Sequence, residues 1–171
     1  MTYKIVKYGD PVLERKCAPV DNFGSGELKQ FVEDMFETMY ASKGIGLAAP
    51  QVGVLKRLTV IDTSAGEDPA QRVVLVNPEI VHKEGSQTGE EGCLSIPDIR
   101  GRVPRAKKVK VRAFNRMAER IDLEAFDFPA RVIQHETDHL DGVLFFDRMK
   151  GFETLTFLDE YSRYWAKDKD E

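Results

Sequence analysis

The chain has 171 residues, 42% of them hydrophobic, which suffices for one domain with a buried core. Its 29 acidic and 25 basic residues give a formal net charge of −4, which argues against a nucleic-acid-binding surface as the main function. The two cysteines, Cys17 and Cys93, imply no disulfide framework and favour a reducing compartment.

The sequence carries no targeting or membrane segment that we recognise. Residues 1–6 lack the apolar run of a signal peptide and the Arg- and Ser-rich character of a transit peptide. No stretch approaches the roughly 20 apolar residues that a membrane-spanning helix needs. We therefore expect a cytoplasmic protein without membrane contact, with residues 1–171 forming a single catalytic domain.

The N-terminal part predicts a short helical turn and one long helix. Asp10 followed by Pro11 is typical of a helix start, and we expect this turn to run to about residue 16. Further along, apolar residues recur at the spacing of one helical face. These residues are Leu28, Phe31, Val32, Met35, Phe36 and Met39. Gly44 and Gly46 end the helix, and residues 44–53 show no periodicity, so we expect an irregular loop there.

Strand patterns dominate the middle of the chain. Residues 57–62 and 72–76 are rich in β-branched and aliphatic side chains, and an exposed loop joins them. Residues 108–114 alternate Lys or Arg with apolar side chains, as a half-buried strand does. Residues 121–126 alternate in the same way, so the two segments are expected to pair antiparallel through a turn at 115–119.

Two more helices are expected in the C-terminal part. Pro129 in a first turn starts one, which ends at Gly142. A final helix is indicated by Phe152, Leu155, Leu158, Tyr161 and Trp165, followed by a frayed charged tail at 167–171. Strands and helices that do not alternate strictly favour an α+β fold, with mostly antiparallel sheets wrapped around a central helix.

The central helix carries a metal-binding pattern. His135 and His139 are four residues apart and therefore project from the same helical face toward one cation. Glu136 lies one position round the helix, where it can contact a metal-bound water without binding the metal. Apolar residues flank the two histidines on this helix, which argues against an ordinary solvent-exposed helix. The sequence therefore predicts a metal-dependent hydrolase.

A catalytic site of this kind needs a third protein ligand. The candidates are carboxylates and a cysteine. Cys93 lies in a constrained segment between Gly92 and Pro97, and the two histidines that need a third ligand raise its odds. His82 is interpreted as a structural or surface residue, and Cys17 as a structural one.

Three segments together resemble the peptide deformylase family. The first is Gly-Ile-Gly-Leu-Ala-Ala-Pro-Gln at 44–51, the second Glu-Gly-Cys-Leu-Ser at 91–95, and the third His-Glu-Thr-Asp-His at 135–139. Their order and separation also fit the family, as does the opening at residues 8–13. The resemblance covers nearly the whole chain.

The resemblance implies a site, a cofactor and a substrate. Cys93, His135 and His139 would bind the metal, natively Fe²⁺, with Zn²⁺, Ni²⁺ or Co²⁺ as alternative occupants. Metal-bound water would attack the formyl group of an N-terminal formylmethionine, with Glu136 as general acid and base. The side-chain amide of Gln51 and the backbone N–H of Leu94 would stabilise the oxyanion.

The substrate is expected to bind in an apolar pocket. By position, Ile45, Phe128 and Val132 line it for the methionine side chain, and Arg100 lies near its rim. The backbone at Gly46 and Gly92 would pair with the substrate as an added strand, since glycine allows close approach.

The expected partners are nascent N-formylmethionyl peptides. Some relatives dock on the ribosome through a basic C-terminal region. Residues 150–171 hold more Asp and Glu than Lys and Arg, so charge does not support such docking here, and a transient ribosome contact is the most that we expect. A monomer is expected.

Two other functions fit part of the pattern. A peptidase could use the same histidine pair, although such enzymes usually complete the site with His or Glu. A blue-copper module also combines two histidines with a cysteine, but it has no use for Glu136 beside a bound water.

Overall fold

The computed structural model describes residues 1–166, so the tail predicted at 167–171 lies outside the described residues. Its strands are β1 (Gly46–Ala48), β2 (Leu58–Ile61), β3 (Val73–Glu84), β4 (Gln87–Cys93), β5 (Ile96–Arg105), β6 (Lys108–Phe114), β7 (Arg120–Phe126) and β8 (Thr156–Phe157). Its α-helices are α1 (Gly26–Ala41), α2 (Asp127–Leu140) and α3 (Leu158–Tyr164). Short 3₁₀ helices lie at η1 (Pro11–Glu14), η2 (Ala49–Val52), η3 (Pro69–Gln71) and η4 (Phe145–Arg148).

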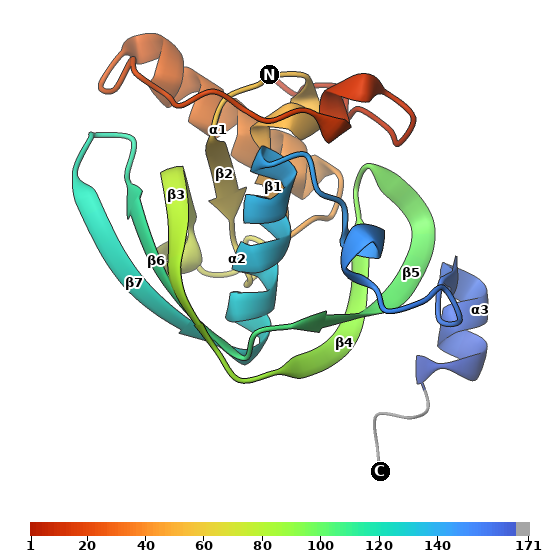
Figure 1. The fold of residues 1–171 in the computed structure, drawn as a ribbon. Coiled ribbons are helices and arrows are strands. Elements are labelled where there is room, and N and C mark those ends of the chain that lie inside the picture. Colours follow the sequence, from red (N-terminus) through yellow and green to blue (C-terminus); the bar gives the residue numbers. More distant parts are fainter. Residues whose placement is uncertain (167–171) are drawn as a thin grey trace.

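Two antiparallel sheets enclose α2 (Figure 1). One sheet has the order β1-β2-β3-β6-β7 and the other β4-β5-β8. The α+β class with sheets around a central helix is therefore confirmed. None of the helices in residues 1–166 combines the length and apolar character needed to cross a bilayer.

The larger sheet is buried on both faces where β2 crosses it. Leu58 and Val60 pack with the apolar face of α1, whereas Ile61 packs with α2 through Ile133. This arrangement explains why all four residues of β2 are buried. The sequence of a strand that is covered on both faces is a continuous apolar run, and this pattern is what predicted β2.

The β6–β7 hairpin forms as expected. Lys108 pairs with Phe126 and Phe114 with Arg120, so the register holds along the whole length of the two strands. At the turn, the Asn115 side chain accepts hydrogen bonds from the backbone N–H groups of Met117 and Glu119. Such side-chain bonds to the local backbone are what asparagine contributes to turns.

Several predicted elements differ from the structure. The segment expected to be a loop contains β1, which pairs antiparallel with β2. The turn predicted to reach residue 16 is the 3₁₀ helix η1, capped by Asp10. The last helix is limited to Leu158–Tyr164, because residues 156–157 instead pair with Ile99 and Arg100 of β5 as β8.

The exposed loop after β2 is fixed by one buried carboxylate. Asp62 is fully buried and accepts hydrogen bonds from the Tyr40 hydroxyl at 2.5 Å, from the Ser64 hydroxyl at 2.6 Å and from the Gly66 N–H at 3.1 Å. Burial alone would raise the pKa of Asp62, but the hydrogen bonds from Ser64 and Tyr40 outweigh it and hold the pKa below its usual range.

We expect Asp62→Asn to lower the free energy of unfolding by about 2 kcal/mol at pH 7, because the amide nitrogen that replaces Oδ2 cannot accept the hydrogen bonds from Tyr40 and Gly66. The contribution should be complete above roughly pH 4, the usual aspartate pKa, and be lost as the pH falls through the lower folded-state value. Urea unfolding of both proteins at pH 7 and at pH 3 measures this. Asp21→Asn, at an exposed position, is the control. An unchanged stability at pH 7 would contradict the anchoring role.

Candidate metal centre and active site

The three predicted metal ligands converge in the structure. His135 and His139 project from one face of α2 with ring centroids 5.0 Å apart. Cys93, the last residue of β4, places its Sγ atom 3.4 Å from Nε2 of His139. One donor atom from each residue lies within 4.8 Å of the other two, and all three side chains are buried. A strand end and a helix thus meet at a site that no single segment could form.

The donor set fits a divalent transition metal. One thiolate and two imidazoles are ligands for zinc and for iron, and three protein ligands leave a coordination position for water or substrate. Burial lowers the pKa of His139 well below its usual value, so its ring is neutral, as a ligand must be. Burial would also lower the pKa of His135, but hydrogen bonding to Cys93 and Glu91 raises it well above its usual value. A metal ion bound here would therefore have to displace a proton from His135.

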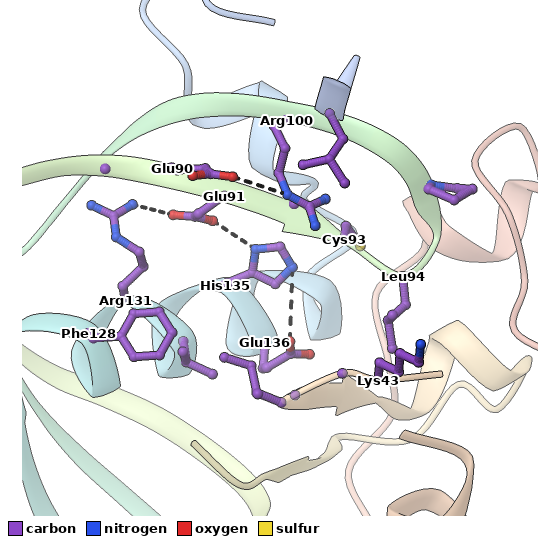
Figure 2. A pocket seen from close by; sticks show the side chains of 18 of the residues that line it. Lys43, Glu90, Glu91, Cys93, Leu94, Arg100, Phe128, Arg131, His135 and Glu136 are labelled. Carbon is purple, nitrogen blue, oxygen red and sulfur yellow. Dashed lines mark hydrogen bonds and ion pairs between the residues drawn. The ribbon is translucent and has the colours of Figure 1, made fainter. Parts of the chain in front are cut away.

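A buried carboxylate behind the histidines fixes one of them. Oε1 of Glu91 lies 2.8 Å from Nδ1 of His135, which leaves Nε2 of that ring free to face the cluster (Figure 2). The Arg105 guanidinium donates to both oxygens of Glu91, at 2.9 Å each. Burial alone would raise the pKa of Glu91, but Arg105 and His135 lower it to about 2. Such a partner fixes the orientation of a ligating histidine.

The predicted proton carrier lies beside the cluster. Oε1 of Glu136 is 4.0 Å from Nε2 of His135, and Oε2 is buried without a hydrogen-bond partner among the described residues. Burial raises the pKa of Glu136 to about 7, with Glu91 adding to the effect and His135 opposing it. A carboxylate that titrates near neutrality can both accept and return a proton.

Gln51 presents an amide donor to the same place. Its side-chain oxygen accepts a hydrogen bond from the Ala48 N–H at 2.9 Å. Its Nε2 group therefore faces the cluster, 3.4 Å from Sγ of Cys93 and 3.2 Å from Oγ of Ser95. The 3₁₀ helix η2 starts at Ala49–Pro50, directly after β1. Its tight turn allows the Gln51 side chain to reach back to the Ala48 N–H.

A cavity of about 640 Å³ opens beside the cluster. Its walls include every predicted catalytic and substrate-binding residue. These are Ile45, Gly46, Gln51, Gly92, Leu94, Arg100, Phe128, Val132 and Glu136. Val132 is buried, whereas Phe128 is 50% exposed and lies at the mouth.

Arg100 lies across the cavity wall at Gly92. A side chain at Gly92 would overlap the Arg100 guanidinium. Glu90 holds this guanidinium at 3.3 Å (Figure 2), and the Ile99 carbonyl accepts a hydrogen bond from it at 3.1 Å. Glycine at this position therefore leaves room for the Arg100 guanidinium in the cavity wall.

Sequence reasoning missed three residues of this site. Glu91, Arg105 and Arg131 form a buried ion-pair network behind His135, in which Arg131 lies 2.5 Å from Glu91. Of these, only Glu91 lies within one of the three recognised segments. Each partner is far away in sequence, so no local pattern indicated the pairing.

Gly46 is packed directly against Glu136. A Cβ atom at this position would lie 2.5 Å from Oε1 of Glu136, closer than real contacts allow. We expect Gly46→Ala to displace the carboxylate and lower kcat/KM by roughly 100-fold, since a shift of about 1 Å in a reacting group has effects of that size. Steady-state kinetics with a thermal-unfolding control test this. Gly26→Ala is the control: a Cβ at this position would meet open space, so kcat/KM should stay unchanged.

Comparison with known proteins decides the family. A family model described as polypeptide deformylase matches residues 2–154. The chain belongs to the peptide deformylase family. A peptide deformylase from Acidobacterium capsulatum is 55% identical over 153 residues, covering 90% of this chain and 89% of that protein. This membership decides against the peptidase and copper-protein alternatives.

Solved structures agree with the assignment. A peptide deformylase from Thermotoga maritima is 43% identical with a TM-score of 0.83, covering 88% of this chain and 99% of that one. A family member from Acinetobacter baumannii with Met-Ala-Ser bound is 38% identical with a TM-score of 0.81, covering 87% and 99%. The chain is thus an enzyme of a family that removes N-formyl groups from nascent peptides, as the three motifs implied.

Proposed function

We propose that this enzyme hydrolyses the formamide of N-terminal formylmethionine with a divalent metal held by Cys93, His135 and His139. The observation that carries the proposal is the approach of these three donors to within 4.8 Å of one another, with Glu136 beside them. Family membership supports the formyl substrate. The metal we propose is Fe²⁺, with Zn²⁺, Ni²⁺ and Co²⁺ as substitutes in a purified sample.

The bound cation would supply Lewis acidity and lower the pKa of a water molecule, which makes hydroxide available near neutral pH. Ferrous iron next to a thiolate also predicts sensitivity to oxygen, because both oxidise readily.

Glu136 moves the protons in this proposal. Its carboxylate accepts a proton from the attacking water at one oxygen, and it then returns that proton to the departing amine. The raised pKa, caused mainly by burial, makes both transfers feasible at the same pH. Formate and a free N-terminal amine are the products.

Two donors stabilise the negative charge on the formyl oxygen. We assign the Nε2 group of Gln51, which the Ala48 N–H fixes by holding the other end of the amide, and the backbone N–H of Leu94. A donor of this kind, placed before the reaction begins, contributes about 3–4 kcal/mol to transition-state stabilisation.

The substrate backbone would lie between two strand edges. β1 and β4 are terminal strands of their sheets in the described chain, and they contribute Gly46 and Gly92 to the cavity wall. An extended peptide can therefore pair with both, as strand addition requires. Ile45, Phe128 and Val132 would surround the methionine side chain, with Arg100 at the rim. The relative with bound Met-Ala-Ser supports binding of such a product peptide.

The proposal is tested with three peptides of equal length, namely formyl-Met-Ala-Ser, its unformylated counterpart and formyl-Ala-Ala-Ser. Enzyme prepared without oxygen should release free amine from the first and cleave no internal bond in any of them. Equal processing of the formyl-Ala peptide would remove the case for the methionine pocket. Internal cleavage would overturn the proposed reaction. Cytoplasmic location, a monomeric state and transient ribosome contact stay predictions.

A further inference from the structure

The C-terminal part of the chain contributes a side chain to the wall of the cavity. Leu158, the first residue of α3, lines the cavity and is half-buried. It lies beyond residues 2–154, which the polypeptide deformylase model matches. The pairing of β8 with Ile99 and Arg100 of β5 brings it there. The proposed mechanism gives Leu158 no role, so its place in the wall needs another explanation.

The two faces of β4 contact different parts of the molecule. The Glu91 side chain points to His135 on α2, whereas the Glu90 side chain pairs with Arg100 of β5 at 3.3 Å (Figure 2). A Cβ atom on Gly92 would meet the same Arg100 guanidinium. Since side chains alternate along a strand, β4 has an inner face toward α2 and an outer face toward Arg100.

Leu158 belongs to the outer face as well. Thr156 of β8 pairs with Arg100, so these two side chains lie on the same face of the sheet. Phe157 is extended, with φ −63° and ψ 147°, so the side chain of Leu158 leaves the chain on the same side as that of Thr156. Leu158 and Arg100 therefore line the cavity from the same direction.

A substrate that is added to β4 as a strand follows the same alternation. Its methionine side chain, in the proposed pocket of Phe128 and Val132 on α2, points to the inner face. The side chain of the next residue then points to the outer face, where Arg100 and Leu158 line the cavity. Glu90 balances the charge of Arg100, so the remaining contact that this wall offers is the apolar side chain of Leu158.

We propose that Leu158 is a specificity-determining residue for the residue that follows formylmethionine, and that it favours a large apolar side chain there. This inference rests on the proposed deformylation and on binding of the substrate as an added strand. A large apolar side chain removes its own surface and that of Leu158 from water. A polar side chain of equal size would instead lose hydrogen bonds to water against the same leucine.

The proposal is tested on metal-loaded enzyme with formyl-Met-Leu-Ser, formyl-Met-Ala-Ser and formyl-Met-Asn-Ser, in which asparagine matches leucine in size. Wild-type kcat/KM should be about fivefold higher for the leucine peptide than for the alanine peptide, and lowest for the asparagine peptide. Leu158→Ala should reduce the advantage of the leucine peptide to less than about twofold. Leu123→Ala is the matched control, since this half-buried leucine of β7 packs in the cluster around Val111, outside the cavity wall.

Two results would overturn the proposal. One is a wild-type enzyme with equal kcat/KM for the leucine and asparagine peptides, because the second side chain would then meet no apolar wall. The other is an equal loss on all three peptides in Leu158→Ala, which would mean that Leu158 only supports β5. No reaction with any formylmethionyl peptide would instead contradict the proposed function, on which this inference rests.

A second variant covers the case in which Leu158→Ala does not fold. Leu158→Lys places a cation at the same point of the wall, where it should attract a glutamate that follows formylmethionine. The kcat/KM ratio of formyl-Met-Glu-Ser to formyl-Met-Leu-Ser should therefore rise at least about fivefold over the wild-type ratio. A residue that only supports β5 would not change this preference by its charge. An unchanged ratio in Leu158→Lys enzyme that unfolds at the wild-type temperature would overturn the proposal.

Discussion

Glu136→Ala is expected to retain its metal and to lose nearly all deformylation. The residue lies beside the cluster but is not one of the three mutually close donors, so its removal leaves the proposed ligand set complete. Its carboxylate is buried and titrates near pH 7, which suits a group that accepts and returns one proton in each cycle. General acid–base groups contribute about 10²–10⁴-fold, and here one residue would serve both steps, so we expect the loss to reach the upper end of that range.

The measurement pairs kcat/KM for formyl-Met-Ala-Ser with metal content of the same sample. Glu136→Gln, which keeps the shape but cannot take up a proton, should lose activity equally. Glu27→Ala, on the exposed first turn of α1, is the matched control for loss of a helical carboxylate. Near wild-type turnover in Glu136→Ala would refute the proton-transfer role, and loss of metal would show that Glu136 helps to hold it.

Cys93→Ala is expected to lose both the metal and the activity. Of the three proposed ligands, Cys93 alone lies outside α2, and without its sulfur two histidines remain on one helix. Loss of a supporting residue beside a metal ligand already weakens binding 10–100-fold, so loss of the ligand itself should cost more than about 100-fold. Metal content after dialysis and turnover with added Zn²⁺ or Co²⁺ measure the effect.

Cys17→Ala provides the matched control. Cys17 is also a buried free cysteine, but it packs against Ala48 and Leu140 in a separate apolar cluster. Burial raises the pKa of its thiol to about 11, so it stays protonated and is a poor ligand. The variant should keep its metal and its turnover. Full metal retention in Cys93→Ala would contradict the proposed coordination.

The parts of the fold that the sequence predicts well are those with local signals. The periodic apolar face of α1 and the alternation in β6 and β7 each identify an element by its own residues, and the structure has all three. β1 is missed because three residues show no alternation, and its strand character comes from pairing with β2. β5 contains Pro97, Gly101 and Pro104, which argue against a strand until β4 pairs with it.

The same distinction between local and long-range signals applies to the active site. Helical spacing places His135 and His139 on one face, and the family motif adds Cys93, so the three residues whose donor atoms converge could be named from the sequence. Glu91 and its two arginine partners could not, because the contacts depend on how β4, β5 and α2 pack.

Crystals of the enzyme grown without oxygen, with diffraction recorded on both sides of the iron absorption edge, would locate the metal directly. We predict one anomalous peak per chain, bounded by the Cys93 sulfur and one ring nitrogen each of His135 and His139. A crystal of active enzyme without a peak there, or with its metal bound elsewhere on the surface, would contradict the whole account.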